Sequence, residues 1–466
     1  MGCNVKRTMM NHLIEWANRT NRKPLVLRGA RQVGKTTLVR MLASELGLTL
    51  VEINLEDSHS FESMLKDRSK ARDVLELILL EHGISESPEN VIFFFDEAQE
   101  SVDLYPYLRY FYELAPEYKI IASGSLFELE IHRSESAQGP TGRVEYAYLE
   151  PMTFSEYLEA SNQVAYNRYQ QIGFDEPLPE SLHSVYSKLF REYLVSGGLP
   201  EVVQASVNKE SPRRIDQIKS DILRGYIEDL PKYSELAGVK LNPKLLERVM
   251  KSVYGKPSNS LSYSKIAEGF RAEVVRQHMD VLRDAKIIRM SFHSGENTPP
   301  LSTSVNLKSY KLFGLDIGLC YTFMGVPLTQ VYSSKDINSD CNGDIAEQYI
   351  AQSIQANSLP YKTGSLHHWE NPSRTGKAEV DFLVERNGVV IPIECKSGKS
   401  GKMKSLRVML ESKKYTQAVR VYSENIEFED IRIEPKNKAG DIDESRVYTC
   451  RLLSIPHYLI DRYLTK

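Results

Sequence analysis

The chain has 466 residues, which is too long for one ordinary hydrophobic core and predicts about three domains. Its composition, 41% hydrophobic and 26% charged, is typical of a soluble globular protein, and no apolar run approaches the roughly 18 residues that a membrane helix needs. The net charge of −3 excludes a strongly basic nucleic-acid binder, and an N-terminus without the apolar core of a secretory signal favours a cytoplasmic protein with no membrane partner.

Strand-like apolar runs alternate with amphipathic stretches through residue 125. The runs read PLVLRG, LTLVEINL, VIFFFDEA and YKIIASGS. Such alternation is typical of a parallel sheet flanked by helices. We therefore expect an α/β domain over residues 1–150.

Three further segments follow. Residues 151–255 carry apolar residues at helical spacing and predict a helical lid or linker region, which ends at the polar stretch GKPSNS. Residues 256–332 combine two short helices, a sharp turn and a hairpin, the pattern of a winged helix-turn-helix. Residues 333–466 predict a small α/β unit that opens with a loop and a helix.

A glycine-rich loop joins the first predicted strand to a helix. Gly29 to Thr36 match G-x-x-x-x-G-K-[ST], the phosphate-binding loop of P-loop NTPases. Backbone N–H groups there cradle phosphates, Lys35 reaches the β- and γ-phosphates, and the Thr36 hydroxyl ligates magnesium. The sequence therefore predicts a site for ATP and Mg²⁺. Its predicted binding residues are Gly29, Ala30, Arg31, Gln32, Val33, Gly34, Lys35, Thr36 and Thr37.

Two acids end the buried run VIFFFDEA. Parallel strands deliver their carboxyl ends to the phosphate side of such a sheet, so we expect Asp96 to hold magnesium and Glu97 to polarise the attacking water. The next run ends in Ser123 and Ser125, at the depth where a polar sensor of the γ-phosphate would lie. For both serines, the alternative that they simply end a strand and have no role in catalysis stays open.

The motifs LRGARQVGKTT, FFFDEAQ, IIASGS, GRVEYAYLEPMTFSEYL and EYLVSGGLPEVV resemble the prokaryotic AAA-type ATPases that carry a C-terminal domain of uncharacterised function. The resemblance covers most of the chain. It implies an AAA core of the additional-strand class, then a winged helix and a domain similar to restriction-endonuclease-like nucleases. It also implies that Arg143 is a finger for the γ-phosphate, within the subunit or across to a neighbour in a homo-oligomer, with a surface arginine as the alternative. The role of Arg31 stays open.

The dipeptide Asn387-Gly388 is the favoured centre of a two-residue hairpin. If Arg386 pairs with Val389, the two residue numbers of every other pair in this antiparallel hairpin also add up to 775. Phe382 then falls opposite Ile393 on an apolar face. On the other face Asp381 falls opposite Glu394, and Glu379 opposite Lys396.

Two carboxylates facing each other across a ladder repel unless a cation lies between them. Asp381, Glu394 and Lys396 form the D…E-x-K arrangement of the nuclease class that the resemblance implies, in which magnesium positions a water and the lysine activates it. Glu347, on the preceding predicted helix, resembles the additional acid of that class. The sequence therefore predicts a second metal site, at Asp381, Glu394 and Glu347. Acids merely exposed beside a turn remain the alternative.

A basic run between residues 396 and 420 makes DNA a candidate partner. We therefore predict a magnesium-dependent ATPase whose nucleotide state controls a C-terminal DNA-binding or nuclease-like module. The alternative is an ATP-driven switch or scaffold whose nuclease-like domain binds a partner without cleaving.

Overall fold

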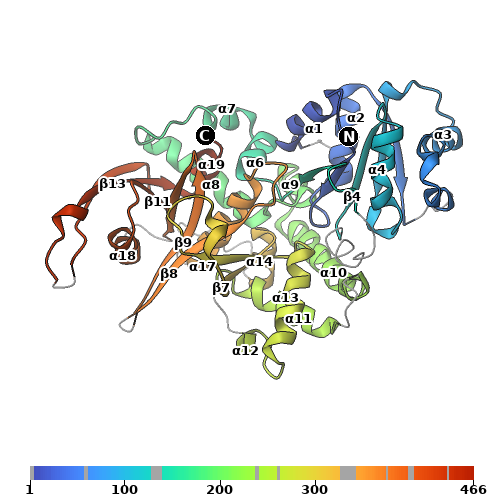
Figure 1. Ribbon diagram of the computed structural model, residues 1–466. Helices are drawn as coiled ribbons and strands as arrows, with labels where there is room; N and C mark the ends of the chain where they lie inside the picture. The colour runs from blue at the N-terminus through green and yellow to red at the C-terminus, as the bar shows by residue number, and fades with distance from the viewer. Residues whose placement is uncertain are drawn as a thin grey trace.

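We analysed a computed structural model of the chain (Figure 1). It describes residues 5–56, 61–126, 139–236, 241–259, 263–325, 343–373, 376–396, 403–437 and 440–466. Figure 1 shows the N-terminal sheet on one side of the molecule and a second sheet on the other, with a group of helices below. No helix within the described residues is long and apolar enough to cross a membrane.

The N-terminal sheet contains five parallel strands in the order β2-β3-β4-β1-β5. Its strands are β1 (Leu25–Arg28), β2 (Thr49–Asn54), β3 (Val91–Asp96), β4 (Lys119–Gly124) and β5 (Glu145–Tyr148). The helices of this part are α1 (Met9–Asn18), α2 (Lys35–Leu46), α3 (Ala71–Glu81) and α4 (Leu104–Leu114). The predicted α/β architecture is confirmed, and β4 lies between β1 and β3 as the additional-strand class requires.

Continuous apolar runs form these strands because helices cover both faces of the sheet. Every residue of β3 is buried. In β1, Leu25 and Leu27 pack into one hydrophobic cluster, whereas Val26 packs into another on the opposite face. The strand therefore alternates between two cores, and its carboxyl end is held firmly where the glycine loop begins.

A run of helices follows the sheet, in agreement with the helical spacing of the sequence. They are α6 (Phe154–Ser161), α7 (Gln163–Tyr169), α8 (Glu180–Ser196), α9 (Pro200–Val207), α10 (Pro212–Leu236) and α11 (Pro243–Gly255). Thr153 and Glu156 form a capping box that fixes the start of α6, with each side chain accepting a hydrogen bond from the other residue's backbone N–H.

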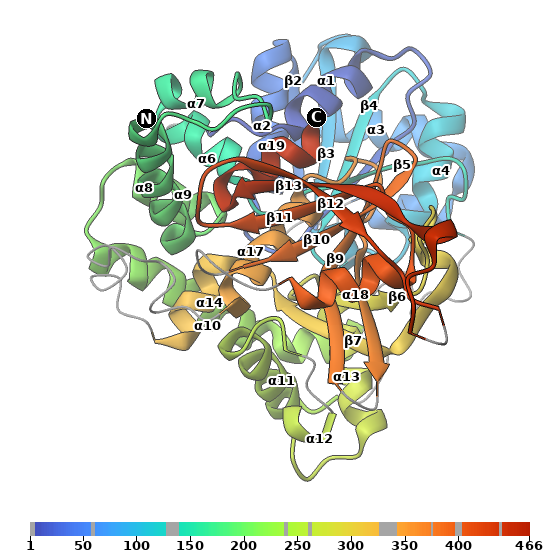
Figure 2. The ribbon, with the colours of Figure 1, turned by 90° about the vertical axis from the view of Figure 1, so that its left-hand side faces the viewer.

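The second sheet has eight strands in the order β12-β13-β11-β10-β9-β8-β6-β7. They are β6 (Ile288–Ser294), β7 (Val305–Gly314), β8 (Leu366–Ser373), β9 (Gly376–Arg386), β10 (Val389–Cys395), β11 (Gln417–Tyr422), β12 (Glu427–Ile433) and β13 (Tyr448–Pro456). The accompanying helices are α12 (Tyr263–Ile266), α13 (Ala272–Asp284), α14 (Ile317–Met324), α17 (Gly343–Ala356), α18 (Lys404–Ser412) and α19 (Ile460–Thr465). Figure 2 views this sheet with its C-terminal strands toward the reader.

The β6–β7 hairpin joins the C-terminal strands in one sheet. Ser291 of β6 pairs in parallel with Leu366 of β8, so the hairpin predicted as a wing continues the ladder of residues 366–456. The sheet thus runs across the expected boundary near residue 332. Sequence periodicity gives no information on such long-range pairing, because an edge hairpin and an inserted hairpin have the same alternation.

Candidate functional site

The glycine loop between β1 and α2 is curled as the motif predicts. Gly29, Gln32 and Gly34 all have positive φ angles, of 151°, 62° and 94°. A Cβ on Gly29 would lie 2.3 Å from the Leu149 carbonyl oxygen, so close packing as well as loop shape requires glycine there. The helix begins at Lys35, and its first-turn N–H groups lack intrahelical partners. These amides and the helix N-terminus can bind phosphate.

The Lys35 ammonium lies inside this loop. Its Nζ atom donates to the carbonyl oxygens of Gly29 and Ala30, each at 3.0 Å, and the side chain is buried. Neutral carbonyls are weaker partners for an ammonium group than charged oxygens are. The contacts with Lys35 are therefore of a kind that a phosphate can replace.

The carboxylate of Asp96 accepts hydrogen bonds from side chains of two neighbouring elements, α2 and β4. The Thr36 hydroxyl donates to one carboxylate oxygen at 2.6 Å, and the Ser123 hydroxyl donates to the other at 2.5 Å. Glu97 follows with a left-handed backbone (φ 50°), and its carboxylate accepts a hydrogen bond from Gln99 at 2.6 Å. Thr36 and Asp96, the predicted magnesium ligands, therefore lie together, and their oxygen donors suit this cation.

Ser125 lies just beyond the end of β4 and is fully buried. Its hydroxyl oxygen has no hydrogen-bond partner among the described residues. A buried hydroxyl without a partner is unfavourable, and a ligand oxygen can relieve this. Of the two predicted serines, Ser123 is already engaged with Asp96, whereas Ser125 is available as a sensor.

Arg143 lies at the opposite edge of the sheet from the loop. Glu145, two residues later, pairs with Leu25 at the start of β1, whereas the loop follows Arg28 at its end. At ~3.3 Å per strand residue, Glu145 is thus about 13 Å from the start of the loop along the strand direction, and Arg143 precedes it in a turn on the side away from the loop. Arg143 instead pairs with Glu113 at 2.9 Å. This placement gives no support to a finger within the same subunit, and a role for Arg143, across to a neighbour or as a surface arginine, stays a prediction.

Residues from outside the sheet cover the loop, and the sequence did not reveal them. Arg31 forms an ion pair with Asp229 of α10, and the Tyr226 hydroxyl donates to the Arg31 carbonyl at 2.6 Å. Arg7 donates to the Val33 carbonyl at 2.9 Å. Arg31 is thus directed toward the helical region. Tyr226 and Asp229 lie on α10 and Arg7 precedes α1, and residues of these types in such segments give no sequence signal of the contact.

The C-terminal hairpin has the predicted register over the part that pairs. Arg386 pairs with Val389 and Phe382 with Ile393, as the sum of 775 requires. The paired positions of β9 and β10 end there, and on the other edge of β10 Glu394 pairs with Arg420 of β11. Asp381 accepts a hydrogen bond from the Cys395 backbone N–H at 2.8 Å. The expected direct pairing of Asp381 with Glu394 lies beyond the paired segment.

A lysine lies among the carboxylates of this hairpin. Lys311 of β7 forms ion pairs with Glu347 of α17 at 2.8 Å, with Asp381 at 3.3 Å, and with Glu379. Glu394 pairs instead with Lys396 at 2.5 Å. The sequence held one signal of this arrangement. The run YKLFG places one lysine among apolar residues, where a buried charge needs partners.

Burial shifts the protonation of this cluster. Burial lowers the pKa of Lys311, but the charges of Glu347, Asp381 and Glu379 outweigh it and hold that pKa well above its usual range. Burial, followed by the charge of Asp381, raises the pKa of Glu347 to about 8. The same two causes raise the pKa of Glu394 to about 7. Lys311 stays charged, and the raised pKa values of Glu347 and Glu394 limit the excess negative charge of the cluster.

The predicted metal ligands do not form a metal site in this arrangement. Within the described ranges, no group of three or more His, Cys, Asp and Glu side chains has a geometry that could hold a metal ion. Glu347 and Asp381 converge on Lys311, whereas Glu394 turns to Lys396. Part of the predicted basic run, including Lys399 and Lys402, lies outside the described residues.

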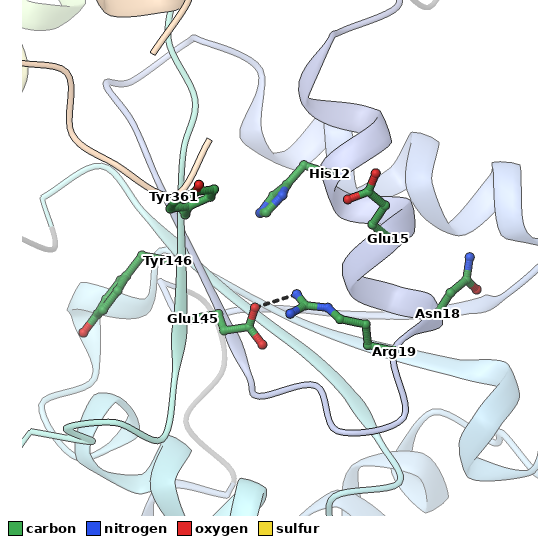
Figure 3. A pocket seen from close by; sticks show the side chains of 7 residues that line it. All are labelled: His12, Glu15, Asn18, Arg19, Glu145, Tyr146 and Tyr361. Atoms are coloured by element: carbon green, nitrogen blue, oxygen red, sulfur yellow. Dashed lines mark hydrogen bonds and ion pairs between the residues drawn. The ribbon is translucent and has the colours of Figure 1, made fainter. Parts of the chain in front are cut away.

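A separate hollow of about 820 Å³ lies between α1 and β5 (Figure 3). The ion pair between Arg19 and Glu145 borders it, and Tyr361 from the C-terminal half lies 6.2 Å from the His12 ring. Burial and then the charge of Arg19 lower the pKa of His12. Glu145 pairs with the start of β1, so this hollow lies away from the phosphate loop.

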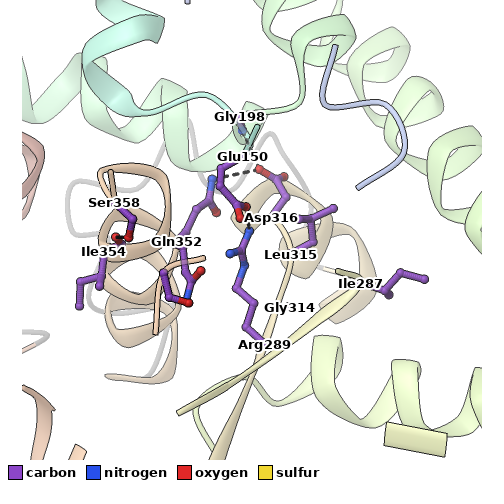
Figure 4. A network of polar contacts seen from close by, with 12 residues as sticks. Glu150, Gly198, Ile287, Arg289, Gly314, Leu315, Asp316, Gln352, Ile354 and Ser358 are labelled. Atoms are coloured by element: carbon purple, nitrogen blue, oxygen red, sulfur yellow. Dashed lines mark hydrogen bonds and ion pairs between the residues drawn. The ribbon is translucent and has the colours of Figure 1, made fainter. Parts of the chain in front are cut away.

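A polar network joins the two halves of the molecule (Figure 4). Asp316, which follows β7, accepts hydrogen bonds from the Gly198 N–H at 2.7 Å and from Gln352 of α17 at 3.2 Å. Arg289 of β6 forms an ion pair with Glu150, which follows β5. The Gly198–Asp316 and Glu150–Arg289 contacts each join a residue that precedes α10 and α11 in the chain to one that follows them.

The strand order, the loop between β1 and α2, and the acid at the end of β3 define a P-loop NTPase domain. Residues 21–158 match the family model described as an AAA domain, so this is an AAA-type P-loop ATPase fold. Two domains of unknown function, DUF8612 and DUF4143, match residues 187–330 and 342–438. The expectation of an AAA-type core followed by uncharacterised domains is therefore confirmed in this coarser form.

Solved structures also show similarity to the chain. The RuvB Holliday junction branch migration motor of Thermotoga maritima is 13% identical with a TM-score of 0.29, over 66% of this chain and 92% of that chain. A variant of the same motor is 14% identical with a TM-score of 0.28, over 66% of this chain and 90% of that chain. We draw nothing further from TM-scores this low. No curated protein matches the chain.

Proposed function

We propose that the protein binds and hydrolyses ATP with magnesium, and that its nucleotide state acts as a switch on the β6–β7 hairpin and the C-terminal sheet. The observation that carries this proposal is a continuous set of polar contacts from the phosphate loop to that hairpin. The proposal rests on the ATPase fold for the chemistry and on these contacts for the coupling.

The residues around the loop suit the nucleotide. The backbone of residues 29–37 and Lys35 would hold the phosphates, and Thr36 and Asp96 would hold magnesium. Magnesium held by these residues would neutralise charge on the phosphates. Glu97 would orient and deprotonate the attacking water. The partnerless hydroxyl of Ser125 supports a sensor role, because it is the one hydroxyl of the two predicted serines that is not already used.

The first route of contacts runs through Arg7. Its guanidinium donates to the carbonyl of Val33 in the loop at 2.9 Å and to the carbonyl of Glu150 at 2.5 Å. The carboxylate of Glu150 in turn pairs with Arg289 of β6. A shift of the loop on phosphate binding would therefore move Arg7. Because Arg7 also holds Glu150, which pairs with the hairpin, the shift would reach β6.

The second route runs through the turn between α8 and α9. A Cβ on Gly34 would lie 3.2 Å from Pro200, so the loop and the start of α9 are in close contact. Gly198, two residues before, donates to Asp316, which directly follows β7. Gln352 on α17 also donates to Asp316. Because the turn is closely packed on both sides, a displacement of the loop would also move the turn and its contact with Asp316.

A switch that does not cleave fits the C-terminal site better than a nuclease does. Strand scission by the predicted D…E-x-K residues needs a divalent cation among the carboxylates, and Lys311 already pairs with two of the three predicted ligands. The exposed bases Lys404 and Arg407 on α18 keep DNA as a candidate partner of the switch.

Hydrogen exchange tests the switch. On addition of ATP and magnesium, we expect slower exchange in peptides covering residues 288–314 of the parent protein and no change in Lys35→Ala. Arg40→Ala, an exposed change on the same helix, serves as the control and should respond like the parent. Binding of ATP without any change in these peptides would contradict the switch. Magnesium-dependent nicking of DNA that Lys396→Ala abolishes would favour the nuclease instead.

A further inference from the structure

We propose that Lys311 is the resident cation of the C-terminal carboxylate cluster, so that the chain itself supplies the positive charge at the position predicted for magnesium. The proposal concerns Lys311, Glu347, Glu379 and Asp381. It does not depend on ATP binding or on the switch, and it assigns this cluster a structural role in joining the hairpin to the C-terminal strands.

The ammonium group is fully matched by its surroundings. A lysine ammonium has three N–H donors. Three carboxylates accept from it, namely those of Glu347, Glu379 and Asp381. Lys311 is 3% exposed, so water contributes little to its solvation and the acids must do so. Removal of any one acid would leave an ammonium donor without its partner.

Other oxygen atoms of the predicted metal ligands also have partners. The second oxygen of Asp381 accepts from the Cys395 backbone N–H, and Glu394 pairs with Lys396. A divalent cation in this class of site takes several oxygen ligands at short distance. Here the three predicted ligands face two different ammonium groups, and gathering them around one ion would require breaking both pairs.

The position of Lys311 in the fold explains why it stays there. Its backbone lies within the β6–β7 ladder, opposite Ser291, and its neighbours Tyr310 and Leu312 are buried. A surface lysine can swing out into water, whereas this one would have to leave a sheet whose adjacent side chains are packed. The lysine comes from the hairpin and the acids from α17 and β9, so the contacts tie three elements together.

Manganese binding in nucleotide-free protein tests the proposal. The measurement uses the full chain carrying Lys35→Ala, by titration with Mn²⁺ and electron paramagnetic resonance. We expect no Mn²⁺ binding that depends on Asp381, which means identical titrations with and without Asp381→Asn. Lys311→Met should gain one Mn²⁺ site, at least about tenfold tighter than any in its parent, and Lys311→Met with Asp381→Asn should lose it.

Thermal unfolding gives a second readout. Lys311→Met should lower the unfolding temperature, because it leaves carboxylates buried together, and Mn²⁺ should restore part of the loss. Lys308→Met, an exposed change on the same strand, is the control and should behave like the parent. Binding of Mn²⁺ by the Lys311-containing protein that Asp381→Asn abolishes would overturn the proposal, and so would a folded Lys311→Met that gains no site. Should Lys311→Met not fold, the comparison with Asp381→Asn alone decides.

Discussion

Two buried lysines of this protein differ in the partners that hold them. Lys35 contacts neutral carbonyl oxygens of its own loop, whereas Lys311 contacts three carboxylates from other elements. A buried ammonium group needs carboxylates to balance its charge, whereas bonds to neutral carbonyl oxygens can be exchanged for bonds to a phosphate. Lys35 is therefore ready to exchange its partners for a phosphate, and Lys311 is not.

Glu97 gives a prediction at the scale of one residue. Glu97→Gln should lower the rate of ATP hydrolysis by about 10²–10⁴-fold, because the amide cannot accept the proton of the attacking water. ATP affinity should stay close to that of the parent, since the carboxylate is not a phosphate ligand. Phosphate release and nucleotide titration measure the two effects. A variant that hydrolyses ATP at the parent rate would remove Glu97 from the reaction.

At the scale of elements, the turn between α8 and α9 has little room. A Cβ on Gly198 would lie 2.2 Å from the Met152 carbonyl oxygen, and a Cβ on Gly197 would lie 2.1 Å from Asp316. Tertiary contact therefore fixes glycine at both positions. This turn connects the phosphate loop, through Pro200, with the end of β7.

Gly198→Ala should destabilise the fold by about 1–3 kcal/mol, because the methyl group forces backbone apart in a packed region. Gly225→Ala is the matched control, since its Cβ meets nothing within 4 Å and it lies inside α10. That change should stabilise by about 0.5–1 kcal/mol through helix propensity. Denaturant unfolding measures both. Equal stability of the two variants would show that the turn tolerates movement.

At the scale of the whole molecule, one hydrophobic cluster runs from α1 to α19. It includes Leu13 near the start of the chain and Tyr463 near its end. The Tyr169 hydroxyl donates to the Tyr458 carbonyl at 2.7 Å, which fixes α7 against the C-terminal segment. The ATPase part and the C-terminal part therefore share a core, and a change in one is felt in the other.

His457 predicts how the stability of this core depends on pH. Complete burial lowers the pKa of His457 to about 4, and its ring stacks on Phe190. Its folded pKa lies below the unfolded value of about 6.5, so stability is complete above pH 6.5 and falls as pH drops toward 4, by about 3 kcal/mol. In His457→Phe this loss should shrink, as urea unfolding at pH 7, 5.5 and 4.5 will show. An unchanged pH slope would contradict the assignment.

Arg143 carries the prediction for assembly. Since it pairs with Glu113 at the end of the sheet away from the loop, we predict that its role in hydrolysis is at the site of a neighbouring copy. Arg143→Ala and Glu97→Gln should each be inactive alone, and an equal mixture should recover part of the activity, because a mixed pair holds one intact site. Arg109→Ala, which removes another partner of Glu113, is the control. Parent activity in Arg143→Ala would make Arg143 a surface residue.

Local pattern was sufficient for part of this protein. The loop of residues 29–37, the buried strands and the register of the 387–388 hairpin are properties of neighbouring residues, since spacing and turn chemistry set them. Local pattern does not reveal the long-range partners of Arg31 or Asp316, because those lie between 36 and 198 residues away along the chain. It also could not assign the β6–β7 hairpin to the C-terminal sheet.

The sequence by itself determined that the chain has a phosphate loop on a parallel sheet, because the residues that bind phosphate are consecutive. Only the tertiary structure decided what lies between the C-terminal carboxylates. The predicted acids lie on α17, β9 and β10, and the cation among them comes from β7, which packs beside them only in the folded chain. Because Lys311 is buried, it keeps carboxylates as its partners. Charge balance in a buried site is a property of everything that packs around it.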